Sequence, residues 1–138
     1  MTTLLELYRY AEGQNIRVDA FPLGKTESLS LRRGDGGSCI AIDPFAVRDT
    51  ADEKTKLAHE LGHCMTGAFY TVQSGADVRV RCENRADKWE VRALVPEQAL
   101  REAVAAGHYE VWDLAEHFGV TEDLMRKAIR LYETGSLK

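Results

Sequence analysis

The chain has 138 residues, of which 44% are hydrophobic and 29% are charged, and its formal net charge is −4 at pH 7. This length supports one hydrophobic core, and hence one compact domain with at most a small appendage. The acidic balance provides no general basic surface for nucleic acid, and no apolar run approaches the about 20 residues of a membrane-spanning helix.

The N-terminal segment, residues 1–10, mixes charged and apolar residues as a short amphipathic helix does, and it does not resemble a cleavable signal. The three cysteines, Cys39, Cys64 and Cys82, are odd in number and lack paired spacing. They are therefore expected to be reduced thiols, with Cys64 and Cys82 buried as small apolar side chains. A cytoplasmic protein without a membrane partner is the expectation.

The next segment changes to the period of β-strands. Residues 28–32 and 39–43 alternate apolar and polar side chains, and the glycine-rich residues 34–37 join them as a hairpin turn. Residues 16–21 predict a third strand, which Pro22 ends or places at an edge. The pattern indicates a small antiparallel sheet beside helices. Its edge either holds a peptide as an additional strand or only covers the core, and both interpretations stay open.

The motif His59-Glu60-Leu61-Gly62-His63 carries the strongest chemical signal. Thr50 to Glu53 reads as a capping box, which predicts a helix from Ala51 through the motif. At about 3.6 residues per turn, the two histidines share one face and can hold one Zn²⁺. Glu60 can then take the proton of a water in the fourth position. The alternative is a pair of surface histidines, which the predicted helix disfavours.

A catalytic zinc site of this kind needs a third protein ligand. Residues 82–96 predict a second helix that ends at Pro96. Glu83, Asp87 and Glu90 fall on roughly one face of it, so spacing alone leaves three candidate carboxylates. We expect Glu83 to bind the metal and Asp87 to accept the N–H of a ligating histidine, fixing its tautomer. The alternative is a solvated charged face.

Residues 67–81 lack a sustained helical period and read as a loop that could line a substrate cleft. Within it, Tyr70 is a candidate donor to the oxyanion that forms during amide hydrolysis. A packed aromatic side chain is the favoured alternative for a single tyrosine. His108 has no motif partner and is given no role.

The last third fits helix–turn–helix spacing over residues 114–129, with Ala115 at the helix crossing and Gly119 in the turn. Electrostatics disfavour direct DNA binding. Residues 108–138 hold four Lys or Arg and six Asp or Glu. Glu122 and Asp123 stand where a recognition helix would approach phosphates. We expect a unit for packing or partner recognition.

Together these motifs resemble the ImmA/IrrE family of small metallopeptidases, in particular its short phage- and mobile-element-type members. The resemblance covers most of the chain from about Asp43 onward. One departure is Glu90, where the broader family often has alanine, so an extra carboxylate is expected near the site. The resemblance is carried by His59-Glu60-Leu61-Gly62-His63, by Glu83-Asn84-Arg85-Ala86-Asp87-Lys88-Trp89 and by Leu94-Val95-Pro96, with further likeness in residues 67–70 and 112–121.

We therefore expect an α+β fold: a small zincin-like domain over residues 1–98, with a helical C-terminal subdomain over residues 99–138 that is packed on it and resembles a helix–turn–helix. The resemblance implies the zincin-like character of this fold. It further implies a zinc-dependent, site-specific metalloendopeptidase that cleaves a cognate helix–turn–helix repressor and so derepresses a prophage, mobile element or stress response. Mn²⁺ or Fe²⁺ can occupy similar ligands. The alternative is a DNA-binding or repressor-binding transcription regulator, with a sensory or structural metal site and no proteolysis.

Overall fold

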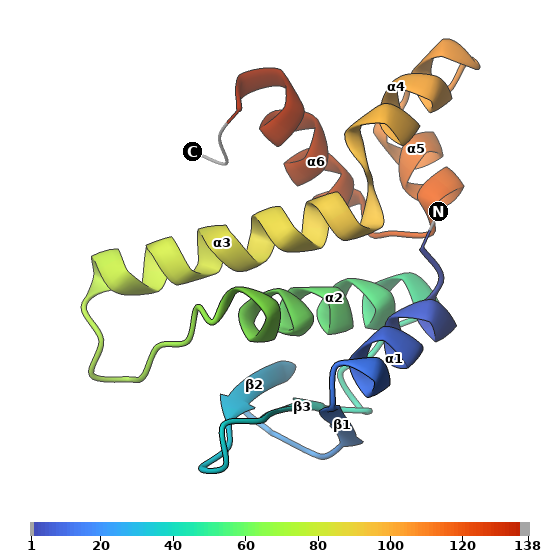
Figure 1. Ribbon diagram of the computed structural model, residues 1–138. Helices are drawn as coiled ribbons and strands as arrows, with labels where there is room; N and C mark the ends of the chain where they lie inside the picture. Colours follow the sequence, from blue (N-terminus) through green and yellow to red (C-terminus); the bar gives the residue numbers. More distant parts are fainter. Residues whose placement is uncertain (1, 136–138) are drawn as a thin grey trace.

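The computed structural model describes residues 2–135, so Met1 and the last three residues of the predicted C-terminal subdomain lie outside it. The described residues form an α+β fold in which α2 lies between a small sheet and α3 (Figure 1). The α+β class predicted from the sequence is confirmed. The elements in chain order are α1 (Leu4–Gly13), β1 (Ile16–Ala20), β2 (Ser28–Arg32), β3 (Ser38–Ile42), α2 (Thr50–Thr66), α3 (Ala76–Leu94), α4 (Glu97–Ala105), α5 (Val111–Phe118) and α6 (Glu122–Thr134).

The sheet is mixed, with strand order β1-β3-β2. Strand β2 pairs antiparallel with β3 through the predicted hairpin, whereas β1 pairs parallel with β3, so that Val18 lies opposite Ile40. The expectation of an antiparallel sheet is therefore wrong for β1. Alternation of apolar and polar residues indicates that a segment is a strand. It does not indicate which strand lies beside it or whether the two strands run parallel. Strand β1 ends before Pro22 and lies at an edge of the sheet, as expected from the position of this proline.

Helix α2 begins one residue earlier than expected. Its N-cap is Asp49, whose side chain accepts a hydrogen bond from the backbone N–H of Asp52 at 2.8 Å. Thr50 is already helical, and Glu53 instead accepts a hydrogen bond from the Tyr8 hydroxyl, so the predicted capping box does not form. An aspartate satisfies the free N–H groups of the first turn and also complements the helix dipole. The helix still carries the motif through its last turns.

Helix α3 begins at Ala76, so the predicted loop over residues 67–81 is too long. Most side chains in the first turns of this helix are exposed, among them Arg79, Val80 and Arg81. A segment that buries so few side chains has no apolar period to detect. The connection that remains between the two long helices is residues 67–75.

One cluster of buried apolar side chains joins the sheet to the helices on both sides of residue 98. Leu57 and Leu61 of α2, Leu94 of α3 and Met125 of α6 are almost fully buried in it. Each such side chain contributes about 1.5–3 kcal/mol through removal from water. This packing holds α2 and α3 side by side. The division into a core of residues 1–98 and a C-terminal subdomain stays a prediction.

The C-terminal helices have the expected helix–turn–helix form. Gly119 adopts a left-handed conformation, with φ of 66°, between α5 and α6, and the Thr121 side chain caps α6. Ala115 and Leu124 are buried at this junction. None of the described helices is long and apolar enough to cross a membrane.

Candidate metal centre

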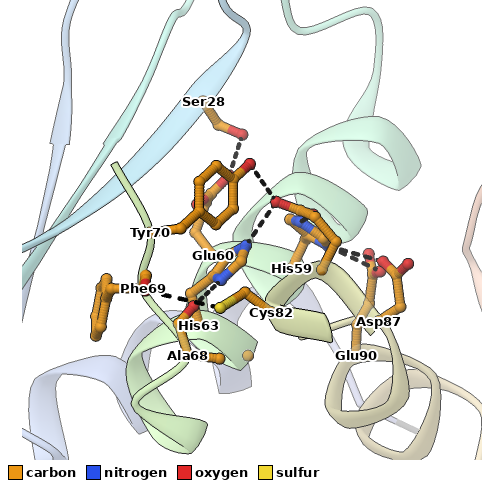
Figure 2. Close-up of polar contacts among 12 residues, drawn as sticks. Ser28, His59, Glu60, His63, Ala68, Phe69, Tyr70, Cys82, Asp87 and Glu90 are labelled. Carbon is orange, nitrogen blue, oxygen red and sulfur yellow. Dashed lines mark hydrogen bonds and ion pairs between the residues drawn. The ribbon is translucent and has the colours of Figure 1, made fainter. Parts of the chain in front are cut away.

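Facing side chains of α2 and α3 converge on one point (Figure 2). His59 Nε2 lies 2.8 Å from one carboxylate oxygen of Glu83, and His63 Nε2 lies 3.2 Å from the other. One ligand atom from each of the three residues lies within 4.8 Å of the others. The structure thus brings together His59, His63 and Glu83, which the sequence analysis expects to be the ligands.

The second nitrogen of each imidazole is held by an acceptor. His63 Nδ1 donates to the carbonyl oxygen of Ala68 at 2.6 Å, and His59 Nδ1 lies 3.1 Å from Asp87 Oδ1. Because Nδ1 serves as the donor, Nε2 of each ring is the atom left to bind a metal. Two Nε2 atoms, one carboxylate and an acceptor behind each imidazole form a donor set that Zn²⁺ takes in proteins. The residues present therefore fit a zinc ion.

Glu60 lies on the sheet side of these donors. Its side chain is 6% exposed, and the hydroxyl of Ser28 on β2 donates to its Oε2 atom at 2.8 Å. This hydrogen bond turns the carboxylate toward the strand, beside the two histidines and not among the three converging groups. The position suits a base, since the carboxylate borders the same cavity without being a ligand itself.

The groups open onto a cavity of about 490 Å³ that runs along β2. Its lining comes from residues 26–31 on one side and from Phe69, Tyr70 and Glu83 on the other, with the motif residues between them. A volume of this size accommodates several residues of an extended peptide rather than a single small ion.

A family model for the IrrE N-terminal-like domain matches residues 11–130. The chain belongs to this peptidase family. The match confirms the resemblance inferred from the motifs and indicates a peptidase, and the histidine–glutamate cluster is able to hold a metal. No curated protein matches the chain at a significant level.

Tyr70 of this IrrE-like domain is not the packed aromatic side chain that the sequence favours. It is 40% exposed, and its hydroxyl donates to Glu83 Oε1 at 2.7 Å. This hydrogen bond to a carboxylate, together with burial, raises the pKa of Tyr70 to about 12. The hydroxyl therefore keeps its proton at neutral pH and remains a donor, whereas its part in oxyanion binding stays a prediction.

Two further charged side chains lie behind His59: Glu90, the extra carboxylate expected near the site, and Lys127. Glu90 is 1% exposed, and its Oε1 atom lies 3.4 Å from His59 Nδ1 without forming a hydrogen bond with any described residue. Burial raises the pKa of Glu90. Lys127 of α6 places its Nζ atom 3.2 Å from Asp87 Oδ1. No sequence motif marks Lys127, because only the packing of α6 on α3 brings it to this position.

The electrostatics of the IrrE-like site favour positive charge. Burial lowers the pKa of His59, but the nearby carboxylates of Asp87, Glu83 and Glu90 outweigh this effect and raise that pKa to about 12. The same contacts from the two histidines lower the pKa of Glu83. A metal dication bound here would replace the imidazolium protons, so metal uptake is expected to release protons.

Proposed function

We propose that this protein is a zinc-dependent, site-specific endopeptidase in which His59, His63 and Glu83 hold the metal. The supporting observation is the convergence of two imidazole Nε2 atoms and one carboxylate beside Glu60, in a cavity that follows a strand. When bound, the metal supplies Lewis-acid activation of water and of the scissile carbonyl. Mn²⁺ or Fe²⁺ would fit the same nitrogen and oxygen donors.

The proton transfers fall to Glu60. In this proposal its carboxylate accepts a proton from the attacking water and then delivers it to the nitrogen of the leaving amine. The Ser28 hydroxyl, which is 2.8 Å from Glu60 Oε2, restrains the carboxylate. Tyr70, on the opposite wall, would donate its hydroxyl proton in a hydrogen bond to the carbonyl oxygen as negative charge develops there.

The substrate backbone would add to the free edge of β2. At the two ends of this strand, Asp43 N–H donates to the Glu27 carbonyl and Arg33 N–H donates to the Gly37 carbonyl. Because antiparallel pairing alternates, the backbone groups of Ser28, Ser30 and Arg32 point away from β3. The Thr26 hydroxyl donates a hydrogen bond to the Ser28 carbonyl oxygen, so this acceptor is already used. Ser30 and Arg32 therefore offer the donors and acceptors that an extended peptide needs.

The proposed substrate is a helix–turn–helix repressor, so that cleavage would derepress a prophage, mobile element or stress response. This proposal draws on the family resemblance and on charge. The chain carries a net charge of −4, which favours encounter with a basic, DNA-binding protein.

The second candidate is a regulator that binds DNA through α5 and α6 and does not cleave. The helix–turn–helix form of these helices, with Gly119 in the turn, supports it. One observation opposes it: Glu122 and Asp123 occupy the first turn of α6, where a recognition helix would approach DNA. Negative charge at this position repels phosphate.

The test mixes the purified protein with candidate helix–turn–helix repressors and Zn²⁺, and analyses the products by mass spectrometry. The proposal expects one discrete pair of fragments that disappears on chelation and in the Glu60→Gln variant, which keeps the ligands. An intact repressor in a stable complex would support a non-cleaving binding module. Salt-dependent retention of operator DNA by the protein alone would support the regulator.

A further inference from the structure

Lys127 connects the C-terminal helices to the metal centre. Its Nζ atom lies 3.2 Å from Asp87 Oδ1, and the same oxygen lies 3.1 Å from His59 Nδ1. One carboxylate oxygen is therefore shared between an imidazole of the site and a cation from α6. Asp87 is only 15% exposed, so water competes little for these contacts.

A second carboxylate competes for the same imidazole N–H. Glu90 Oε1 lies 3.4 Å from His59 Nδ1, is buried and has no hydrogen bond to any described residue. Nδ1 carries a single proton, so it can satisfy only one of the two carboxylates well. The charge-assisted contact from Lys127 holds Asp87 where it accepts that proton, and it balances part of the negative charge that Glu90 adds.

We propose that Lys127 is a positioning residue of the metal site, acting through Asp87 on the orientation of the His59 ring. The inference rests on the proposed function, because it assigns His59 Nε2 to the metal. It gives α6 a purpose other than reading DNA: the helix–turn–helix-like unit completes the support of a metal ligand. Such a role accounts for a cation from α6 lying against α3 beside two acidic side chains.

Two effects of removing Lys127 oppose each other. Loss of a cation would strengthen the attraction of a metal dication, whereas loss of the hydrogen bond would free Asp87 and the His59 ring. The Lys127 side chain is 41% exposed, so solvent weakens the electrostatic repulsion between its charge and a bound metal ion. Loss of Asp87, the hydrogen-bond partner of His59, would typically cost about 10–100-fold in metal affinity, and loss of Lys127, which holds Asp87, is expected to cost the lower end of this range. The positional effect therefore dominates.

The test measures zinc affinity by competition with a chromophoric chelator, which requires no peptide substrate. Lys127→Met is expected to weaken zinc binding about 10-fold, and Lys127→Arg is expected to restore most of it. Arg130→Met, which removes an exposed cation from the same helix, is the matched control and should leave the affinity unchanged. Because cleavage is not measured, failure of the repressor assay and failure of this inference are distinguishable.

A double-mutant cycle with Asp87→Asn decides whether Lys127 acts through Asp87. The effect of Lys127→Met should vanish in the Asp87→Asn background. In the zinc-loaded protein, the ¹⁵N resonance of His59 Nδ1 should shift in Lys127→Met and remain in place in Arg130→Met. Thermal unfolding checks the fold of each variant. Lys127→Ala, which also removes both the charge and the hydrogen-bond donor, replaces Lys127→Met if the latter does not fold, with the same expected loss. Unchanged or tighter zinc binding, or an equal loss in the Asp87→Asn background, would overturn the proposal.

Discussion

Gly62 on α2 lies against the backbone of Ala86 on α3, so closely that a β-carbon at position 62 would be 2.6 Å from the Ala86 carbonyl oxygen. Real side chains do not tolerate such an approach to a backbone atom. The glycine at position 62 therefore sets how closely α3 can approach α2. This close crossing brings Glu83 within reach of both histidines.

Gly62→Ala is accordingly expected to push the two helices apart. Overpacking of this kind costs about 1–3 kcal/mol of unfolding free energy, and zinc affinity should fall with it. Urea denaturation measures the first quantity and chelator competition the second. Gly13→Ala, at a helical position with nothing within 4 Å of the added carbon, is the control and should leave both unchanged or slightly raise stability. Equal behaviour of the two variants would show that the contact imposes no constraint.

Glu83→Ala tests the third ligand. The variant should bind zinc below one equivalent after dialysis, because two histidines alone leave the site a ligand short. Elemental analysis of the purified protein measures the metal content. Glu90→Ala should keep its metal, since Glu90 lies behind His59 and not on the side of Nε2. The opposite result, with metal lost only in Glu90→Ala, would transfer the site to the cluster formed by His59, Asp87 and Glu90.

The metal-free protein should lose stability as the pH rises above neutrality. The folded state raises the pKa of His59 from 6.5 to about 12. Its contribution is therefore complete below pH 6.5 and is lost between 6.5 and about 12. Glu83, with a lowered pKa, contributes above its ordinary value of 4.5 and loses that contribution as the pH falls. The contribution of this pair is thus greatest between the two ordinary values.

Urea denaturation in the presence of a chelator, at about pH 6 and about pH 9, measures this dependence. The unfolding free energy should be lower at the higher pH. His59→Gln, which cannot take up the proton, should show a weaker dependence over the same interval. A stability that rises with pH in the native sequence would contradict the assigned direction.

Tyr70→Phe tests the hydroxyl on the cleft wall. If this group donates to the oxyanion, kcat should fall by about 100-fold while KM changes little, because the hydrogen bond forms fully only in the transition state. Cleavage kinetics on the repressor, or on a peptide that spans its cleavage site, provide the measurement. Tyr109→Phe, at an exposed tyrosine before α5, should behave as the native protein. A change in KM alone would assign Tyr70 to substrate binding.

The sequence predicts most of the site because its main distances are local. Histidines four residues apart share a face on any α-helix. Glu83 and Asp87 are also four residues apart, so they share a face on the second helix. Once the two helices pack together, the observed contacts follow: Glu83 lies between the Nε2 atoms and Asp87 lies at Nδ1 of His59.

Features that depend on tertiary packing escape such reasoning. The burial of Glu90 and the approach of Lys127 require α6 to lie on α3, and no periodic pattern encodes that placement. The parallel pairing of β1 depends on β3 inserting between the other two strands. The first turns of α3 bury few side chains, so they resemble a loop in sequence although their backbone is helical.

Anomalous diffraction from zinc-loaded crystals locates the bound metal directly. The proposed function expects one peak bonded to His59 Nε2, His63 Nε2 and the Glu83 carboxylate, with Glu60 facing the peak and not bonded to it. A peak at His59 Nδ1 between Asp87 and Glu90, or no peak beside His63, would contradict it.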